Sequence, residues 1–491
     1  MASRPPTVGS QPGTTGPRWE GGDISSNVLS ERIGLFGVLA LVVGNAISIP
    51  IFVLPGPLAG AAGPSVVLAA VAAAVPAGLV VLYNAQLGSA MPVAGGLYVY
   101  ISRLTAPFWG FLVPFTLPIV NWAGLLFTAI GFAEYTRFFL DLPADWLIYG
   151  FLVAVLLINL LGIKTVARAQ ILFVVLLFLA LLVFIVPGVF AIEPGNYTPT
   201  FPDGFGGFGI AIVALYYPYL GFGMVTELGE EIDDPGRTIP IALFVGIAIV
   251  SLFYVGLIGV LVGVVPASEL AETNAAVAAA ATEFLPGPLA NFVAFGALFA
   301  VASTVNTTLL VSSRTVMRAA RDGILPSALS RIHPRFGTPY VSILALGVPP
   351  LLLATVIQEE VVALSVFIAL AVLTAMFFSA IALWNLPREF PEHYANATLK
   401  LRRSRGLLFA VVGGLVVSAG LWMVSLIQLP IAGLLLYGWF AIGYVYYRYK
   451  IATQPEDGGL YMRMVTLDEH EEAFAERQTY EGAAGDPGES D

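Results

Sequence analysis

The sequence of 491 residues has no cysteine, only three histidines and few charged side chains. The absence of cysteine excludes disulfide bonds, thiolate nucleophiles and sulfur-ligated metals. The three histidines, His333, His393 and His470, fall in predicted loops or in the C-terminal tail. They cannot form a metal site or a catalytic group inside an apolar segment. We therefore expect no metal, no cofactor and no enzymatic activity.

Charge is scarce as well: 11% of the residues are charged, whereas 58% are hydrophobic. A water-facing surface of this size needs more charge, so a soluble fold is excluded. A helix that crosses ~30 Å of hydrocarbon needs about 20 mostly apolar residues. The predicted fold class is an all-α polytopic membrane protein with twelve transmembrane helices, at 34–61, 64–90, 107–133, 145–163, 169–192, 208–229, 239–265, 289–314, 340–357, 361–384, 406–427 and 430–447.

Lysine and arginine are unevenly distributed among the predicted loops. When alternate loops are assigned to opposite sides of the membrane, every basic residue except Arg137 falls on the side of the two termini. Short loops that face the cytoplasm carry the excess of basic residues. The distribution therefore predicts a multi-pass protein of the cell (cytoplasmic) membrane with both termini in the cytoplasm. One helix more or fewer would destroy the asymmetry, so the asymmetry also supports the helix assignment.

Both ends of the chain are predicted to be disordered and cytoplasmic. Residues 1–33 are rich in proline, glycine, serine and threonine, and contain no apolar core typical of a cleavable signal peptide. Residues 451–491 carry eleven acidic side chains against Arg463 and Arg477, and thus most of the net charge of -10. We interpret this tail as a solvated segment that aids solubility, with a docking role as the alternative.

Two of the apolar segments are interrupted near their middle. Asn45, Ser48 and Pro50 interrupt the first, and Pro218 and Gly221 interrupt the sixth at a similar depth. Paired interruptions in two halves of five helices each are typical of an inverted-repeat transporter with a binding site at the midplane. We predict a five-plus-five inverted repeat of 34–192 and 208–384 with broken helices 1 and 6, followed by two peripheral helices in 406–447.

Each interruption taken alone has a simpler interpretation. Proline kinks and glycine packing notches are common in membrane helices. The occurrence of two interruptions at matching depth favours the binding site.

Four motifs carry a resemblance to a known family. They are PVAGGLYVY at 92–100, EEIDDPGRTIP at 230–240, NTTLLVSSRTVMRAARDGILP at 306–326, and the set Gly44, Asn45, Phe52, Leu54 and Pro55 in the first segment. In this order and at these spacings, the chain resembles the amino acid/polyamine/organocation (APC) superfamily of permeases over nearly all of its membrane portion.

The resemblance implies alternating access and a substrate held between the two breaks. Backbone N–H groups near 48–52 are expected to receive an anionic group, and freed carbonyls at Ala46, Ile47, Tyr217 and Leu220 an ammonium group. The aromatic residues of the sixth segment are expected to cover the substrate, with helix packing as the alternative. The predicted substrate-binding residues are Gly44, Asn45, Ala46, Ile47, Ser48, Ile49, Pro50, Ile51, Phe52, Tyr217, Tyr219, Leu220, Gly221 and Phe222.

The sequence departs from the family pattern in the first break. Amino acid permeases usually carry glycine, a small residue and glycine where Ser48, Ile49 and Pro50 stand. Pro50 has no N–H to offer a carboxylate, although proline is comfortable in the first turn of a helix that Ser48 could cap. An α-amino acid remains the favoured substrate, and this departure makes an amine or an unusual carboxylate a stronger alternative.

The coupling ion is a second open question. Some proton-coupled relatives place a lysine in the fifth segment, where this chain has Leu177. An ionisable residue deep in a span suggests a proton or gating role, with a position at the membrane interface as the alternative. Hydroxyls of the eighth segment could instead line a cation site, or bond their own backbone. The candidates for coupling or gating are Glu227, Ser303, Thr304, Asn306 and Thr307.

These observations predict a secondary active permease for amino acids, coupled to protons or working by exchange rather than coupled to sodium. The alternatives are an amine or polyamine transporter and a transporter-like solute sensor. A channel would need a continuous polar pore, whereas here the polar residues cluster at mid-depth. The expected partners are a small amino acid or amine, the lipid bilayer and protons, and no nucleic acid.

Overall fold

The computed structural model describes residues 33–92, 96–161, 167–202, 204–227, 232–273, 275–321, 323–357, 360–401 and 405–453. The described residues are almost entirely helical, and an isolated bridge between Ile33 and Ile232 is their β-type contact. Eleven helices in the described part of the chain are long and apolar enough to cross a membrane. The predicted fold class, an all-α polytopic membrane protein, is therefore confirmed.

The first half of the chain begins with three short helices and continues with long ones. These helices are α1 (Leu35–Ala46), α2 (Pro50–Val53), α3 (Pro55–Ala62), α4 (Val66–Ala90), α5 (Gly96–Leu104), α6 (Pro107–Arg137), α7 (Ala144–Leu161) and α8 (Ala167–Gly188), with 3-10 turns η1 (Gly63–Ser65), η2 (Val189–Ala191) and η3 (Pro194–Tyr197). Gly63 turns the chain between α3 and α4 at a φ of +62°, where a Cβ would also collide with the ring of Pro202.

The second half has the same mixture of interrupted and long helices. It comprises α9 (Phe205–Tyr216), the 3-10 helix η4 (Tyr217–Gly223), α10 (Met224–Glu227), α11 (Pro235–Val264), α12 (Ala267–Leu270), α13 (Ala276–Phe284), α14 (Gly287–Arg321), η6 (Ser327–Ser330), α15 (Tyr340–Leu353), α16 (Val361–Glu389), α17 (Pro391–Asn396), α18 (Gly406–Gln428) and α19 (Pro430–Thr453).

The ninth predicted span is shorter than expected. The sequence predicted a helix over 340–357, but α15 has 14 residues and ends at Leu353. At 1.5 Å per residue it reaches about 21 Å, less than the hydrocarbon thickness. Pro349 cannot donate to the carbonyl of Ala345, and the indole N–H of Trp122 on α6 donates to that oxygen instead at 2.9 Å.

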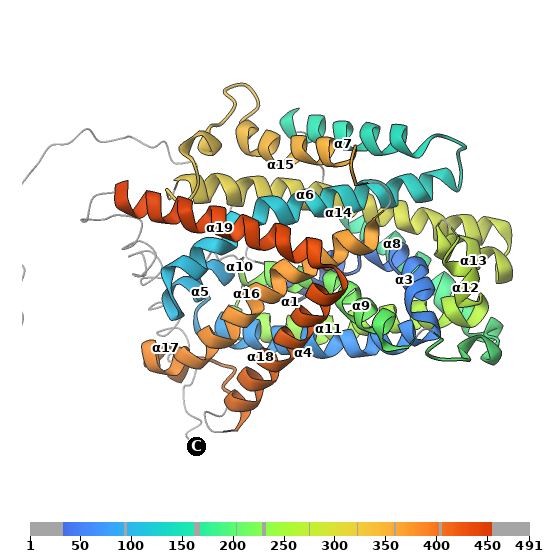
Figure 1. Ribbon diagram of the computed structural model, residues 1–491, viewed down its shortest axis with the longest axis horizontal. Coiled ribbons are helices and arrows are strands. Elements are labelled where there is room, and N and C mark those ends of the chain that lie inside the picture. Colours follow the sequence, from blue (N-terminus) through green and yellow to red (C-terminus); the bar gives the residue numbers. More distant parts are fainter. Residues whose placement is uncertain are drawn as a thin grey trace, which may run out of the picture.

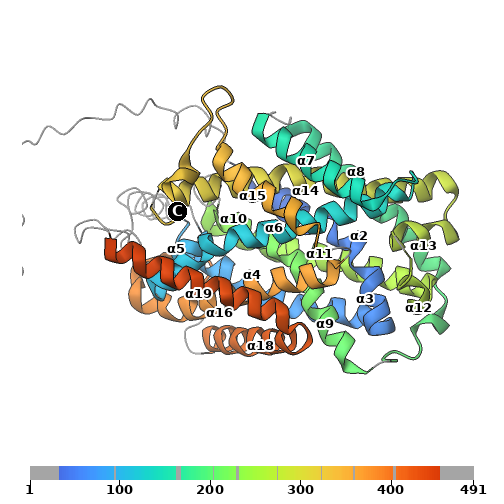
Figure 2. The same cartoon turned by 45° about the horizontal axis from the view of Figure 1, so that its top comes forward.

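The long helices pack into one bundle around the interrupted ones (Figures 1 and 2). Helix α1 packs against α11 and η4, and α9 packs against α4. Helix α6 contacts α7, α14 and α16, while α14 contacts α8 and α15. Helices α18 and α19 join this bundle from outside, on α16, α4 and α6. The interrupted segments are thus held by neighbours on several sides.

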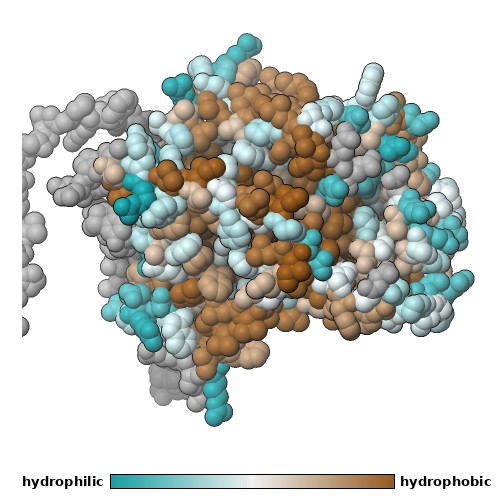
Figure 3. All heavy atoms as spheres, viewed as in Figure 1, coloured by the Kyte–Doolittle hydropathy of each residue, from teal (hydrophilic) through white to brown (hydrophobic). Residues whose placement is uncertain are grey.

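The two ends of the bundle carry different short elements. Figure 1 places α5, α17 and the end of α19 at one end, and α12 and α13 at the other. This division agrees with the predicted alternation of loops. Apolar side chains cover the middle of the face seen in Figure 3, and hydrophilic ones gather toward its ends. Exposed residues such as Phe36, Leu252 and Phe409 belong to the apolar surface that a bilayer would cover.

Candidate functional site

The first interruption lies where the sequence predicted it. Helix α1 ends at Ala46, and α2 begins at Pro50. The N–H of Ile47 still bonds the carbonyl of Val43 at 2.8 Å. Among the described residues, the N–H groups of Ser48 and Ile49 have no hydrogen-bond partner. Two amide donors are therefore available inside the protein, next to a helix end.

The residues of this interruption are buried, and their side chains serve mainly the protein itself. The amide of Asn45 donates to the carbonyl of Leu41 one turn earlier at 2.9 Å. Ser48 does not cap α2, because the residue before the helix is Ile49 and no side-chain cap is formed. The expected serine cap is thus wrong, since α2 starts one residue later than such a cap requires. Ile47, Ile49 and Ile51, in and next to this interruption, are all buried.

The second interruption takes a different form from the first. The sequence predicted a broken helix, and here the chain continues from α9 as the seven-residue 3-10 helix η4. A 3-10 stretch of this length within a helix is uncommon and often marks a hinge. Pro218 lacks the N–H that an α-helical turn would use here, which favours the change of winding. The α-helix is interrupted as predicted, while the chain stays coiled.

The two interruptions touch each other. A Cβ on Gly221 of η4 would lie 3.1 Å from the backbone nitrogen of Ala46 and 3.1 Å from the carbonyl carbon of Asn45. Contacts this short are tighter than ordinary van der Waals contact, so a side chain at position 221 requires the neighbouring backbone to shift by a few tenths of an ångström. The sequence predicted that these two segments meet, and the structure brings them into backbone contact.

The aromatic residues of η4 point to two different neighbours. Tyr217 faces α6, where its ring meets Phe127 edge-on at 5.3 Å. Tyr219 faces α11, and its hydroxyl lies 3.0 Å from that of Ser251. Phe222 stacks on Tyr219 at 6.0 Å between ring centroids. All three rings thus pack against protein neighbours, and the Tyr217 hydroxyl has no hydrogen-bond partner among the described residues. We therefore keep Tyr217 as the first aromatic candidate for covering a substrate.

Tyr254 on α11 is a site residue that the sequence analysis missed. Its hydroxyl points to the carbonyl of Ala46 at 3.5 Å, and its ring lies 6.1 Å from that of Tyr219. One of the carbonyls expected to receive an ammonium group is thus occupied in part by a protein donor. A tyrosine within the apolar seventh segment was the available signal, but its depth relative to the break depends on helix packing.

Helix α2 is tied to α6 by Tyr135. The Tyr135 hydroxyl donates to the carbonyl of Phe52 at 2.9 Å, and the rings of the two residues meet edge-on at 5.8 Å. Tyr135 thus joins α2 and α6 just beyond the first interruption.

The candidates for coupling are only partly described. The hydroxyls of Ser303 and Thr304 both donate to the carbonyl of Ala300, at 3.0 and 2.8 Å. A hydrogen bond to the backbone of their own helix is the alternative to a cation site that the sequence left open for these hydroxyls. Leu177, at the position of the family's lysine, is buried. The side chains of Leu220, Glu227, Asn306 and Thr307 lie outside the described part of the structure.

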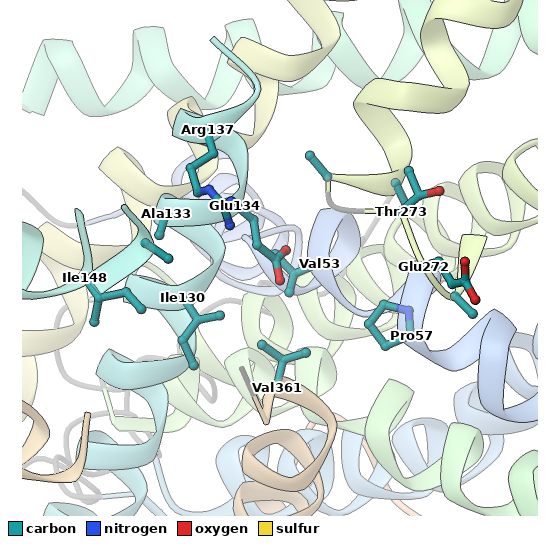
Figure 4. A pocket seen from close by; sticks show the side chains of 14 residues that line it. Val53, Pro57, Ile130, Ala133, Glu134, Arg137, Ile148, Glu272, Thr273 and Val361 are labelled. Carbon is teal, nitrogen blue, oxygen red and sulfur yellow. The ribbon is translucent and has the colours of Figure 1, made fainter. Parts of the chain in front are cut away.

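A cavity of about 150 Å³ lies at the end of the bundle that carries α12 and α13 (Figure 4). We call it the α6–α13 cavity. Glu134 and Arg137 extend from α6 on one wall, and Glu272 and Thr273 lie opposite, with Pro57 of α3 between them. The sequence analysis missed this cavity, because Glu134 lies one residue beyond its predicted third span and Glu272 lies in a loop.

Comparisons with known proteins agree on one family. The family model described as "Amino acid permease" matches residues 33–395. The branched-chain amino acid permease BcaP of Bacillus subtilis is 24% identical over 74% of this chain and 82% of its own length. BcaP of Lactococcus lactis is 29% identical over 74% of this chain and 83% of its own length. The methylthioribose transporter of Bacillus subtilis is 24% identical over 87% of this chain and 94% of its own length.

Proposed function

The chain belongs to the amino acid permease family of the APC superfamily, and from this premise we propose that it is a secondary active transporter of amino acids that works by alternating access. As a member, it is a multi-pass membrane transporter of amino acids or related solutes. The proposal adds the substrate site, the mechanism, the coupling and the orientation.

One observation carries the proposal: the backbone contact between Gly221 of η4 and the first interruption at Asn45 and Ala46. Two helices lose their α-helical bonding at the same place, next to the unpaired N–H groups of Ser48 and Ile49. Unpaired amides inside a membrane protein are costly unless a ligand or water satisfies them. A substrate carboxylate is a suitable acceptor for these two donors. We propose the segments 44–52 and 217–222 as the substrate site.

The packing of the helices supports an inverted repeat of 34–192 and 208–384. Each span of the first half is matched with the span five places later in the chain, in the second half. Under this match the observed helix contacts correspond: α1 on α11 corresponds to α9 on α4, and α6 on α16 corresponds to α14 on α8. The pair α6 and α7 likewise corresponds to α14 and α15. Two halves that form equivalent contacts can tilt against each other around a shared centre, which is the motion that alternating access requires.

A neutral α-amino acid is the substrate class that the site supports best. Ile47, Ile49 and Ile51 are buried around the break, and no carboxylate side chain is described there to neutralise the extra charges of a polyamine. The permeases BcaP of two bacteria are named for branched-chain amino acids, which supports the same class. The missing donor at Pro50 leaves an amine as the second candidate, since an amine needs carbonyls only.

We further propose that both termini face the cytoplasm, because the basic residues lie on their side. The α6–α13 cavity then faces the outside. Coupling to protons or exchange is proposed over coupling to sodium. The hydroxyls of Ser303 and Thr304 donate to the carbonyl of Ala300 in their own helix, as hydroxyls in membrane helices often do.

Counterflow in proteoliposomes tests the proposal. Vesicles that hold the purified protein are preloaded with one unlabelled amino acid or amine, and the uptake of the same labelled compound is followed. We expect saturable counterflow with L-leucine, L-isoleucine or L-valine, and none with putrescine. Binding without any flux would overturn the proposal in favour of a solute sensor, and unsaturable flux would indicate a channel.

A further inference from the structure

The α6–α13 cavity is lined by Val53, the last residue of α2, and α2 begins directly after the first interruption. Phe52 and Tyr135, whose rings meet edge-on, are both fully buried. Their next neighbours along the chain, Val53 and Glu134, line the cavity. Since α2 has four residues, the cavity begins about 6 Å beyond the free amides of the break. A solute in this cavity would be one helical turn away from the proposed substrate site.

The walls of the cavity combine both signs of charge. Its described lining contains two carboxylates, Glu134 and Glu272, and one guanidinium, Arg137. Glu134 and Arg137 lie three residues apart on α6 and share one wall, while Glu272 stands on the other (Figure 4). The formal sum of these charges is negative. Such a lining attracts an ammonium group and repels a molecule with a net negative charge.

The volume limits what the cavity can hold. About 150 Å³ is the size of cavity that accommodates a molecule as small as benzene, and it is smaller than the usual ligand pocket. The remaining lining is apolar and includes Val53, Pro57, Ile130 and Val361. The cavity thus fits an ammonium group with a short aliphatic chain.

We propose that the α6–α13 cavity is a second binding site, which holds the ammonium group of the amino acid between Glu272 and Glu134 before the solute reaches the proposed central site. This inference rests on the proposed function for the identity of the solute. It gives the transporter a selective step ahead of the central site: solutes without an amine are disfavoured at this cavity.

The cysteine-free chain allows a direct test. Thr273→Cys places one thiol on the cavity wall, and its labelling is compared between a cationic and an anionic methanethiosulfonate, the trimethylammonium-ethyl and sulfonatoethyl reagents. Removing one charge at ~6 Å in water changes each rate about threefold, in opposite directions. We expect Glu272→Gln to lower the cation-to-anion rate ratio about tenfold. The control, Glu283→Gln, makes the same charge change near the far end of α13, outside the cavity lining and about 10 Å along the helix from Ala276, where screening by salt should leave the ratio nearly unchanged.

Protection by ligands identifies the group that is bound. Excess L-leucine and 3-methylbutylamine should slow the labelling of Thr273→Cys, and 4-methylpentanoate, which has the carboxylate but no amine, should not. Equal labelling ratios in the two glutamine variants, or protection by the acid alone, would overturn the inference. If Glu272→Gln fails to fold, the protection series on Thr273→Cys alone decides.

Counterflow on the same vesicles separates the two proposals. Normal leucine counterflow without charge-selective labelling or amine protection removes the cavity site and leaves the transporter. Amine protection without any flux keeps the cavity site and removes the transporter.

Discussion

Gly221 lies directly against the peptide that joins Asn45 and Ala46, so two segments 175 positions apart in the sequence meet backbone to backbone. A side chain at position 221 must displace one of them. We expect Gly221→Leu to abolish transport, and Gly221→Ala to weaken it with a packing cost of about 1–3 kcal/mol. Counterflow of the reconstituted variants measures the effect.

Gly223 offers a matched control for this prediction. It belongs to the same 3-10 helix, but no atom lies within 4 Å of the Cβ that alanine would add. Gly223→Ala should therefore retain most of the transport. Wild-type flux in Gly221→Leu would remove the proposed site.

Tyr217 is the aromatic residue of η4 that we expect to touch the substrate. Tyr217→Ala should reduce transport without loss of folding, because its ring packs edge-on against Phe127 and anchors no other element through a described hydrogen bond. Tyr217→Phe keeps the ring, and a loss of affinity of about tenfold in this variant would assign a substrate hydrogen bond to the hydroxyl. Substrate titration of counterflow, with thermal unfolding as a check on folding, distinguishes these effects.

Tyr219 provides the comparison within the same turn. Its hydroxyl is already used by Ser251, so Tyr219→Phe should lower stability by about 1 kcal/mol and leave the apparent affinity nearly unchanged. A larger loss of affinity in Tyr219→Phe than in Tyr217→Phe would exchange the roles assigned to the two residues.

The hydroxyl of Tyr135 connects α6 to the carbonyl of Phe52 on α2. Tyr135→Phe removes this bond and keeps the edge-on ring contact. We expect α2 to separate from α6 more readily, so that a thiol introduced by Val53→Cys reacts several-fold faster with a water-soluble thiol reagent. An unchanged rate would mean that the ring contact, rather than the hydrogen bond, holds α2 against α6.

The dependence of transport on sodium distinguishes two roles for the hydroxyls of Ser303 and Thr304 on α14: a bond to their own backbone, or a cation site. Because we propose coupling to protons or exchange, we expect transport to be the same in sodium and in choline buffers. Ser303→Ala should then have no effect on the ion dependence. A strong requirement for sodium that Ser303→Ala abolishes would restore the cation site.

The sequence predicted the fold and the location of the interruptions because both depend on local properties. Apolar length fixes a spanning helix, and the prolines at 50 and 218 remove backbone donors wherever the helix lies. The 3-10 winding of η4 and the shortness of α15 were not predicted. Both depend on what neighbouring helices supply, such as the indole of Trp122 that bonds the carbonyl freed by Pro349.

The site was predicted in part, for a related reason. Sequence spacing located the two segments, but it could not show that Tyr219 and Phe222 turn toward α11 while Tyr217 turns toward α6. Tyr254 and the α6–α13 cavity were missed altogether, because they arise where helices distant in the sequence meet.

The short reach of α15 has a consequence for the surrounding lipid. This helix packs beside α7 at the edge of the bundle, where its apolar length of about 21 Å is less than an average bilayer requires. Lipids along this edge must compress their acyl chains or leave polar groups in contact with hydrocarbon. Bilayers with shorter acyl chains reduce this mismatch, so the acyl-chain length of the lipid affects the stability of the protein in the membrane.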